Sequence, residues 1–540
     1  MGRGDGARRG ARDAKPRTAP VARRRDGDIA PYRQAARGVR GREGARRGAR
    51  EEARKRGHGE GCVRGGVYGE GIQRGGRGRG KWGFILRMER LFPIMRRILF
   101  LLFQRGVMTK IGVGILGFGT VGAGVAKGLL DNHEELLERT GIDIELRKIA
   151  DLDITTDRGV SVPAFVLTTD AMGVIHDPNV QIVVELIGGT TIAKTFVCEA
   201  LKAGKPVVTA NKKLLAEFGS EIFALARENE TDIYFGASVG GGIPIIRSLR
   251  DGLVATKIEK LYGILNGTCN YILTAMEQEG APFDVVLAKA QKLGFAEANP
   301  TLDVDGFDTL HKAAILAALA FGFSPDIHTL PVRGIRGTLE AQDITRALEL
   351  GYRIKLLATM KRVNDGVELS VGPTLVPANG MMGSVSGVFN AAMVKSDMDD
   401  WTMFYGRGAG RLPTAATVVG DIAEVARSLA AGTHRAVTMP VASKPLAIKP
   451  AGDVFSRNYV RLSLRDEPGS LSTVTGIFSA HGVSILSAVQ RGDSVDGFAS
   501  VVFLTHEVRQ SDLQAALTEI EAQACSAGTA VCLRIEHPGE

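Results

Sequence analysis

The chain has 540 residues, 44% of them hydrophobic, which is long enough for three or four domains with substantial cores. Residues 1–107 hold 29 Lys and Arg against 10 Asp and Glu, whereas residues 108–540 hold 39 against 49. The formal charge of +9 therefore arises from a basic leader, and the acidic body argues against a nucleic-acid-binding surface in residues 108–540. Five cysteines without a CxxC pair or regular spacing argue against a zinc site or disulfide framework and favour a reducing, cytoplasmic setting.

The leader, residues 1–107, has few large apolar residues before position 82, so we expect it to be disordered. Its apolar part, residues 82–103, is broken by arginines, and its longest apolar run is six residues, far short of the roughly 20 that span a membrane. Its Arg-Gly tracts could bind RNA, its basic apolar part could lie on a membrane surface, and its arginines suit a transit peptide. The alternative is that Met108 is the true start and the leader is upstream sequence read through.

A strand, a glycine-rich turn and a helix follow in TKIGVGILGFGTVGAGVAKGLL. The first glycine of Gly117-x-Gly119-x-x-Gly122 permits a tight turn, the second lets the backbone approach a pyrophosphate, and the third lets the helix pack closely on the strand. The helix N-terminus attracts the anion. The pattern predicts dinucleotide binding by the residues of the turn, namely Gly117, Phe118, Gly119, Thr120, Val121 and Gly122.

The cofactor is left open between NAD and NADP. A second strand, IDIELRKIAD, ends at Asp151, whose carboxylate could bind the ribose hydroxyls of NAD. Asp151 lies 29 residues after Gly122, later than the usual spacing of about 20, and Arg147 and Arg158 could offer a phosphate site for NADP.

Strands and helices continue to alternate as far as DIYFGASVGGGIPII, which predicts a mostly parallel, doubly wound sheet of the Rossmann type. Loops at the carboxyl ends of such strands carry the chemistry. Gly188, Gly189 and the pair Asn211–Lys212 are therefore predicted to face the cofactor.

The stretch GFAEANPTLDVDGFDTLHKAAILAALAFG places four acids before a helix that is almost wholly apolar. Asp308 and Lys312 are four residues apart and so share one face of that helix. Every residue from 313 to 321 is apolar, which leaves the helix no evident solvent face for an ion pair. A buried ammonium needs partners, and the acids upstream can supply them, so the stretch predicts a functional site.

The same stretch resembles the signature of homoserine dehydrogenases, with Ala290, Gly294, Asn299, Pro300, Asp303, Gly306, Asp308 and Lys312 in register. ELIGGTTIAKTFVCEALKAGKPVVTANKKLLA, GASVGGGIPIIRSLR, GILNGTCNYIL and YGRGAGRLPTAATVV resemble further blocks of that family. The resemblance runs from Met108 to the C-terminus. It implies NAD(P)-dependent interconversion of L-aspartate 4-semialdehyde and L-homoserine, on the route to threonine and methionine.

The resemblance also implies residue roles. Lys312 would donate the proton to the developing alkoxide, Lys212 would lie near both nicotinamide and substrate, and Asp308 would orient the lysines. Glu297 and Asp303 would hold the substrate ammonium, while Gly267 and Thr268 would line the same pocket. Asp305 receives no role.

The family binds a sodium-type cation, held largely by main-chain carbonyls, in a segment that matches Gly236, Val239, Gly241 and Ile243. The family usually has Glu where this chain has Gly236. The missing carboxylate removes local negative charge, although a carbonyl ligand survives the substitution.

After a helix that returns to the first domain comes a proline-containing connector and then a βαββαβ pattern that resembles an ACT domain. In its turn DEPGSL, Asp466 could accept an effector ammonium and Gly469 would let the backbone approach. The resemblance implies a threonine effector and a homodimer or homotetramer. The expected domains are nucleotide-binding (108–240), catalytic and dimerising α+β (241–432), a linker (433–455) and the ACT domain (456–540).

Overall fold

The computed structural model describes residues 109–540, except residue 365, residues 434–445 and residues 492–493. The predicted leader and much of the predicted linker lie outside the described residues. The described residues fall within one compact unit. None of the helices in these ranges combines the length and apolar character that a bilayer crossing requires.

The first sheet is parallel, with strand order β3-β2-β1-β4-β5-β6. Its strands are β1 (Lys110–Leu116), β2 (Asp143–Ala150), β3 (Leu167–Thr168), β4 (Ile182–Glu185), β5 (Val207–Thr209) and β6 (Ile233–Tyr234). Chain order reverses between β1 and β4, which is the switch point of a doubly wound fold. The predicted Rossmann-type sheet is confirmed.

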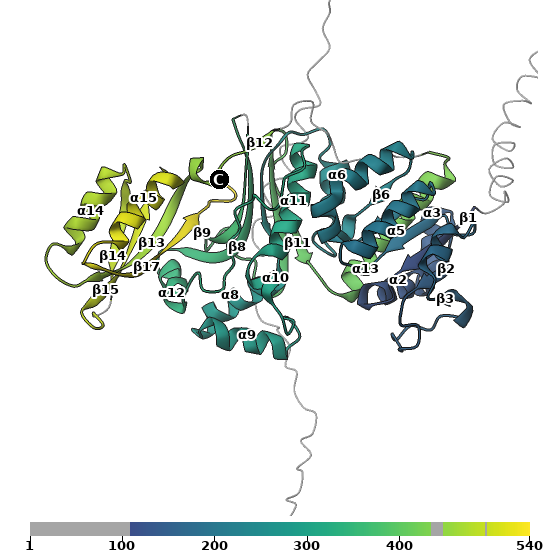
Figure 1. Cartoon of the computed structure of the whole chain (residues 1–540), viewed down its shortest axis with the longest axis horizontal. Coiled ribbons are helices and arrows are strands. Elements are labelled where there is room, and N and C mark those ends of the chain that lie inside the picture. The colour runs from purple at the N-terminus through teal and green to yellow at the C-terminus, as the bar shows by residue number, and fades with distance from the viewer. Residues whose placement is uncertain (1–108, 365, 434–445, 492–493) are drawn as a thin grey trace, which may run out of the picture. The chain divides into compact units, whose positions relative to one another are not determined.

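Helices cover both faces of this sheet (Figure 1). Along β4, Val183 faces one core while Ile182 and Val184 face the other, as the two-residue period of a strand requires. One face carries α4 (Ala171–His176), α5 (Thr191–Lys202) and α6 (Lys212–Glu228). The other carries α2 (Thr120–Asp131), followed by α3 (His133–Thr140), and α13 (Arg411–Ala430), which is the predicted returning helix.

The second sheet is formed by antiparallel strands in the order β11-β10-β7-β8-β9. Its strands are β7 (Ile258–Ile264), β8 (Tyr352–Val363), β9 (Gly366–Pro377), β10 (Phe389–Ser396) and β11 (Asp400–Arg407). The accompanying helices are α7 (Ile245–Arg247), α8 (Gly267–Glu279), α9 (Phe283–Lys292), α10 (Thr301–Val304), α11 (Phe307–Phe321) and α12 (Ala341–Glu349).

Helix α11 contacts β8 and β9 of this sheet and α6 of the first domain (Figure 1). Thirteen of its 15 residues are buried, including Asp308 and Lys312, so the prediction of a helix without a solvent face is confirmed. A charged pair on a buried helix must find its partners inside the protein.

The C-terminal domain has the predicted βαββαβ order, formed by β13 (Phe455–Arg465), α14 (Ser470–Ala480), β14 (Ile485–Gln490), β15 (Phe498–Thr505), α15 (Gln510–Glu521) and β17 (Ser526–Ile535). Short strands β12 (Ala447–Ile448) and β16 (Val508–Arg509) pair with β9 and β13. Strand β17 pairs in parallel with β9, at Arg534–Thr374 and Ile535–Leu375, so the sheets of the catalytic and ACT domains are continuous. The sequence patterns did not predict this joint.

Asp343 on α12 links the catalytic domain to strand β13 of the ACT domain. Its carboxylate is fully buried and accepts hydrogen bonds from Tyr459 Oη at 2.9 Å and from Arg461 Nε at 2.6 Å. It also accepts from the backbone N–H of Glu340 at 2.8 Å, which closes the capping box of α12.

We predict that Asp343→Ala lowers the free energy of unfolding by about 3–5 kcal/mol, because it leaves the largely buried guanidinium of Arg461 with only its longer contact to the exposed Glu340, at 3.4 Å. Urea unfolding would measure the loss. The matched control is Asp305→Ala, which breaks the more exposed ion pair with Arg336 and should cost less than about 1 kcal/mol. Equal, small losses in the two variants would contradict the prediction.

Candidate active site

The glycine turn after β1 has the backbone geometry that the sequence motif predicts. Gly117 has φ +103°, and a β-carbon at Gly122 would lie 2.0 Å from the carbonyl oxygen of Gly117. A β-carbon at Gly119 would meet no atom within 4 Å, so the backbone there borders open space. Helix α2 begins at Thr120 without a side-chain cap, which leaves its first N–H groups available to an anion.

Asp151 follows β2 and is bonded to the same turn. Its Oδ2 accepts from the N–H of Phe118 at 2.5 Å and its Oδ1 from the N–H of Asp153 at 2.9 Å. The carboxylate therefore ties the glycine turn to the end of β2, a local role that the spacing argument did not foresee.

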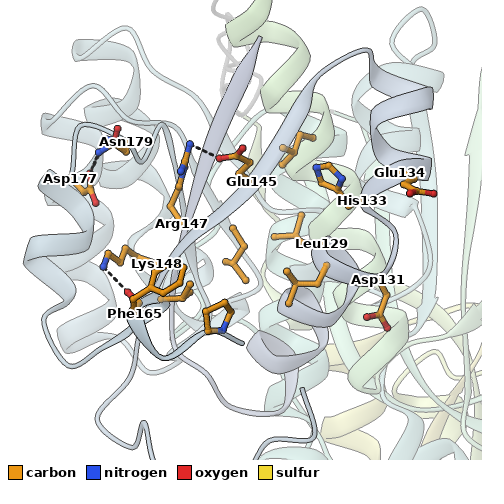
Figure 2. A pocket seen from close by; sticks show the side chains of 15 residues that line it. Leu129, Asp131, His133, Glu134, Glu145, Arg147, Lys148, Phe165, Asp177 and Asn179 are labelled. Carbon is orange, nitrogen blue, oxygen red and sulfur yellow. Dashed lines mark hydrogen bonds and ion pairs between the residues drawn. The ribbon is translucent and has the colours of Figure 1, made fainter. Parts of the chain in front are cut away.

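The two arginines considered for an NADP phosphate are both paired with acids. Arg158 Nη2 lies 2.8 Å from Asp153 Oδ2, and Arg147 pairs with Glu145. Both Arg147 and Glu145 line a pocket of about 800 Å³ beside β2. Figure 2 shows Arg147 pointing toward Glu145 in this pocket, with Lys148 donating to the carbonyl of Phe165. Arg147 is the only residue lining this pocket that was considered for cofactor binding, and none of the residues predicted to bind substrate lines it.

The loop after β4 and the start of α6 are held together by a hydrogen-bonded chain. Glu185 Oε1 accepts from the N–H groups of Ile187 at 2.9 Å and Gly188 at 3.0 Å. Its Oε2 accepts from Thr209 Oγ1 at 2.7 Å. Asn211 donates from Nδ2 to the carbonyl of Gly189 at 2.7 Å and caps α6 with its Oδ1. The chain fixes the Gly188–Gly189 loop beside Lys212.

Asp308 joins two ammonium groups from different parts of the fold. Its Oδ1 lies 2.9 Å from Nζ of Lys212, the first residue of α6, and its Oδ2 lies 2.7 Å from Nζ of Lys312. Lys312 also donates to the carbonyl of Leu265 at 2.6 Å. The side chain of Lys312 is 9% exposed and that of Lys212 is 42% exposed, so Lys212 is the more accessible ammonium.

Asn266, the residue before α8, organises the acids of this cluster. Its Nδ2 donates to Asp303 Oδ1 at 2.7 Å and to Asp308 Oδ2 at 2.9 Å. Its Oδ1 accepts from the N–H of Cys269 at 2.8 Å and caps the helix. Gly267 and Thr268 of NGTCNYIL were predicted to line the site but Asn266 was not, although Asn before a helix is a recognised capping pattern.

The charges of the cluster reinforce one another. Burial raises the pKa of Asp308, but Lys312 and Lys212 together outweigh burial and hold that pKa well below its usual range. The carboxylate of Asp308 in turn raises the pKa of Lys212, with smaller contributions from Asp303 and Glu297. Burial, followed by repulsion from Asp308, raises the pKa of Asp303.

The remaining predicted substrate residues border the same cluster. Glu297 is exposed, and its negative charge contributes to the raised pKa of Lys212. Thr268 Oγ1 donates to the carbonyl of Phe295 at 2.7 Å. A β-carbon at Gly267 would lie 2.8 Å from the carbonyl oxygen of Val388, so a glycine is needed where these two segments meet.

The segment predicted to hold a cation is buried and faces a carboxyl group from α13. The N–H of Gly236 donates to Asp421 Oδ2 at 2.8 Å, and a β-carbon at Gly236 would lie 2.9 Å from both oxygens of Asp421. Burial raises the pKa of Asp421 to about 7, although the Gly236 N–H and Arg250 oppose the rise. A carboxyl group thus occupies the space beside position 236 despite the glycine.

Two of the four predicted carbonyl ligands already accept hydrogen bonds. Gly241 accepts from Thr417 Oγ1 at 2.7 Å, and Ile243 accepts from the N–H of Ile245 at 2.8 Å. The other two predicted ligands, Gly236 and Val239, are both buried. Because a carbonyl oxygen has two lone pairs, each of the two hydrogen-bonded oxygens could still bind a metal ion through its second lone pair.

In the ACT domain, the predicted effector residues lie at the start of α14. Gly469 has φ +100° and lies directly before the helix. Asp466 is exposed, and its Oδ1 lies 3.4 Å from Gln490 Nε2 on β14.

Comparison with known proteins agrees with this architecture. Residues 117–236 match the NAD-binding domain of homoserine dehydrogenase, residues 244–423 match the homoserine dehydrogenase family, and residues 458–525 match the ACT domain. A homoserine dehydrogenase of Neisseria gonorrhoeae is 42% identical over 79% of this chain and 99% of its own length. One of Bacillus subtilis is 42% identical over 75% and 93%.

A solved structure points the same way. The crystal structure of a homoserine dehydrogenase from Thiobacillus denitrificans superposes with a TM-score of 0.76 at 41% identity, covering 80% of this chain and 99% of that one. The family assignment rests on this extent of identity. The glycine turn and the lysine pair bridged by one carboxylate agree with it. The chain belongs to the homoserine dehydrogenase family of NAD(P)-dependent oxidoreductases.

Proposed function

We propose that this protein interconverts L-aspartate 4-semialdehyde and L-homoserine on the route to threonine and methionine, with Lys212, Asp308 and Lys312 as its catalytic group. The bridging of two ammonium groups by Asp308 at the nucleotide-binding edge carries the proposal. We also place the enzyme in the cytoplasm, which fractionation of its source cells would test.

The residues that would hold NAD or NADP are those of the glycine turn, together with Asp151, Gly188, Gly189 and Lys212. The open space at Gly119 and the uncapped start of α2 suit a pyrophosphate. When bound, the nicotinamide supplies or accepts the hydride.

The substrate would lie with its ammonium toward Glu297 and Asp303 and with its reacting oxygen toward the lysines. Glu297 is exposed, and Asp303 is held by Asn266, so one acid is open to a ligand and the other is fixed in place. Gly267 and Thr268, the first residues of α8, add a helix N-terminus that suits the substrate carboxylate.

In the direction of aldehyde reduction, negative charge develops on the carbonyl oxygen, and an ammonium both stabilises it and donates a proton. An N–H bond of lysine breaks as the O–H bond of homoserine forms. Lys312 donates two of its three N–H groups to Asp308 and to the carbonyl of Leu265, and these bonds fix its position. The third N–H group remains available to the substrate oxygen. Lys212 directs one N–H group at Asp308 and would share with Lys312 the donation of a proton to the substrate oxygen.

Oxidation of homoserine reverses the proton transfer, so a lysine must first release its proton. Because Asp308 raises the pKa of Lys212, this release is harder at neutral pH and shifts to more alkaline pH. Asp308 thus favours the protonated amine that aldehyde reduction needs.

A sodium-type cation would bind to the carbonyl groups of Gly236, Val239, Gly241 and Ile243. The carboxyl group of Asp421 beside Gly236 would supply charge that the family usually draws from position 236. Comparing thermal stability in sodium chloride with that in choline chloride would test the cation, and identical stability would reject it.

The ACT domain would bind L-threonine as a feedback effector and contribute to a homodimer or homotetramer. The turn before α14 supports this role, because Gly469 opens the backbone beside the exposed carboxylate of Asp466. Light scattering after size exclusion would give the oligomeric state, and a monomer would reject the assembly.

Lys212→Ala, Lys312→Ala and Asp308→Ala should each lower kcat at least roughly tenfold, because each removes part of the proton-donating group. Initial rates of homoserine oxidation, measured with NAD and NADP separately, would show the loss and the preferred cofactor. The neighbouring Lys213, which faces Glu217, provides the control Lys213→Ala with nearly unchanged kcat. A folded Lys312 variant with wild-type turnover would remove that lysine from the chemistry.

Glu297→Gln should raise KM for homoserine about tenfold with little effect on kcat, because a charged hydrogen bond to the substrate ammonium is worth about 1.5–3 kcal/mol. Steady-state kinetics at saturating cofactor would measure both constants. Asp305→Asn serves as the control, since Asp305 pairs with Arg336 and should leave KM unchanged. An unaltered KM in Glu297→Gln would count against the ammonium role.

L-threonine at millimolar concentration should lower the rate of the wild-type enzyme, and Asp466→Asn should abolish this sensitivity without changing the basal rate. The reason is that Asp466 would lose the charge that holds the effector ammonium. Asp512→Asn, in the first turn of the other ACT helix, is the matched control and should retain inhibition. If threonine does not change the rate of the wild-type enzyme, the effector role is rejected and only a role of the ACT domain in assembly remains.

A further inference from the structure

Glu185, the last residue of β4, is a fully buried carboxylate that the proposed chemistry does not use. It accepts three hydrogen bonds, from the N–H groups of Ile187 and Gly188 and from the hydroxyl of Thr209. The hydroxyl of Thr209 itself accepts from the N–H of Asn211, so its own proton is directed at Glu185. Three donors and no acceptor form the environment of an ionised carboxylate.

The charge of Glu185 lacks a cationic neighbour among the described residues, where none of the ion pairs includes it. Three other buried acids do have one, whereas Asp421, which accepts from the Gly236 N–H, is also in no ion pair among the described residues. Asp308 faces two lysines, Asp343 faces Arg461, and Glu368 faces Arg534. A buried charge without a partner is costly, so a cation is expected from outside the chain.

The topology indicates which cation reaches this edge. The switch point between β1 and β4 divides the dinucleotide cleft, with one half of the ligand over β1, β2 and β3 and the other over β4, β5 and β6. Lys212 follows β5 and contacts Asp308, which also contacts Lys312, so a nicotinamide that reacts beside these lysines would lie on the β4 side. The oxidised nicotinamide ring carries a positive charge, and the reduced ring is neutral.

We propose that Glu185 is the buried counter-charge of the oxidised nicotinamide ring, acting across the Gly188–Gly189 loop without touching the ligand. The inference rests on the proposed function, because it needs the nicotinamide at this edge. Charges in a poorly hydrated interior interact more strongly than in water, so a shielded carboxylate beneath the loop favours the cationic ring over the neutral one.

Glu185→Gln tests the charge while preserving the shape of the side chain. Dissociation constants of the oxidised and the reduced dinucleotide, measured without substrate by calorimetry and by fluorescence, should change unequally. We expect the ratio of the oxidised to the reduced constant to rise about five- to tenfold, because only the oxidised form loses a charge interaction. The matched control, Thr209→Val, breaks a hydrogen bond to the same carboxylate and keeps its charge, so its ratio should stay at the wild-type value.

An unchanged ratio in Glu185→Gln, even with both constants raised, would show that the residue only supports the loop and would overturn the inference. If Glu185→Gln does not fold, Glu185→Asp retains the charge and should retain the wild-type ratio, and a shifted ratio there would overturn the inference. Failure of the wild-type protein to bind either dinucleotide would instead defeat the proposed function.

Discussion

The carboxylate of Asp308, shared by Lys212 and Lys312, is the interaction on which the active site depends. Burial of a carboxylate costs several kcal/mol, and only close, well-aligned cations offset that cost. Lys312 comes from the same helix, but Lys212 begins α6 in the first domain, so the cost is offset only when the two domains are assembled. The site is therefore completed by the same contact that brings α6 against α11.

The same capping device positions the site twice. Asn211 and Asn266 each use the side-chain oxygen to cap a helix, α6 and α8 respectively. In each case the amide NH₂ remains, and it donates to Gly189 in one case and to Asp303 and Asp308 in the other. Aspartate, serine or threonine could cap these helices equally well but could not organise several acceptors at once. This requirement explains asparagine at both positions.

The parts of the site that are local in the chain could be predicted, and those that depend on distant contacts could not. The glycine turn and the four-residue spacing of Asp308 and Lys312 are local patterns, and both were predicted. The partnership of Asn266 with two acids and the position of Asp421 beside Gly236 arise from contacts between distant segments. The continuous sheet of the catalytic and ACT domains likewise rests on two residue pairs that leave no periodic trace in the sequence.

The proposed role of Glu185 gives the nucleotide-binding edge a second acid besides Asp308. Hydride transfer to the oxidised ring removes a positive charge, and the reverse step restores it beside Lys212 and Lys312. Two ammonium groups alone would disfavour that cation, and Asp308 is already committed to both of them. Glu185 accepts hydrogen bonds only from neutral donors beside the Gly188–Gly189 loop, so its charge is not paired with a cation of the described residues. In the proposed role, its charge offsets that of the oxidised ring in a cleft that also holds Lys212 and Lys312.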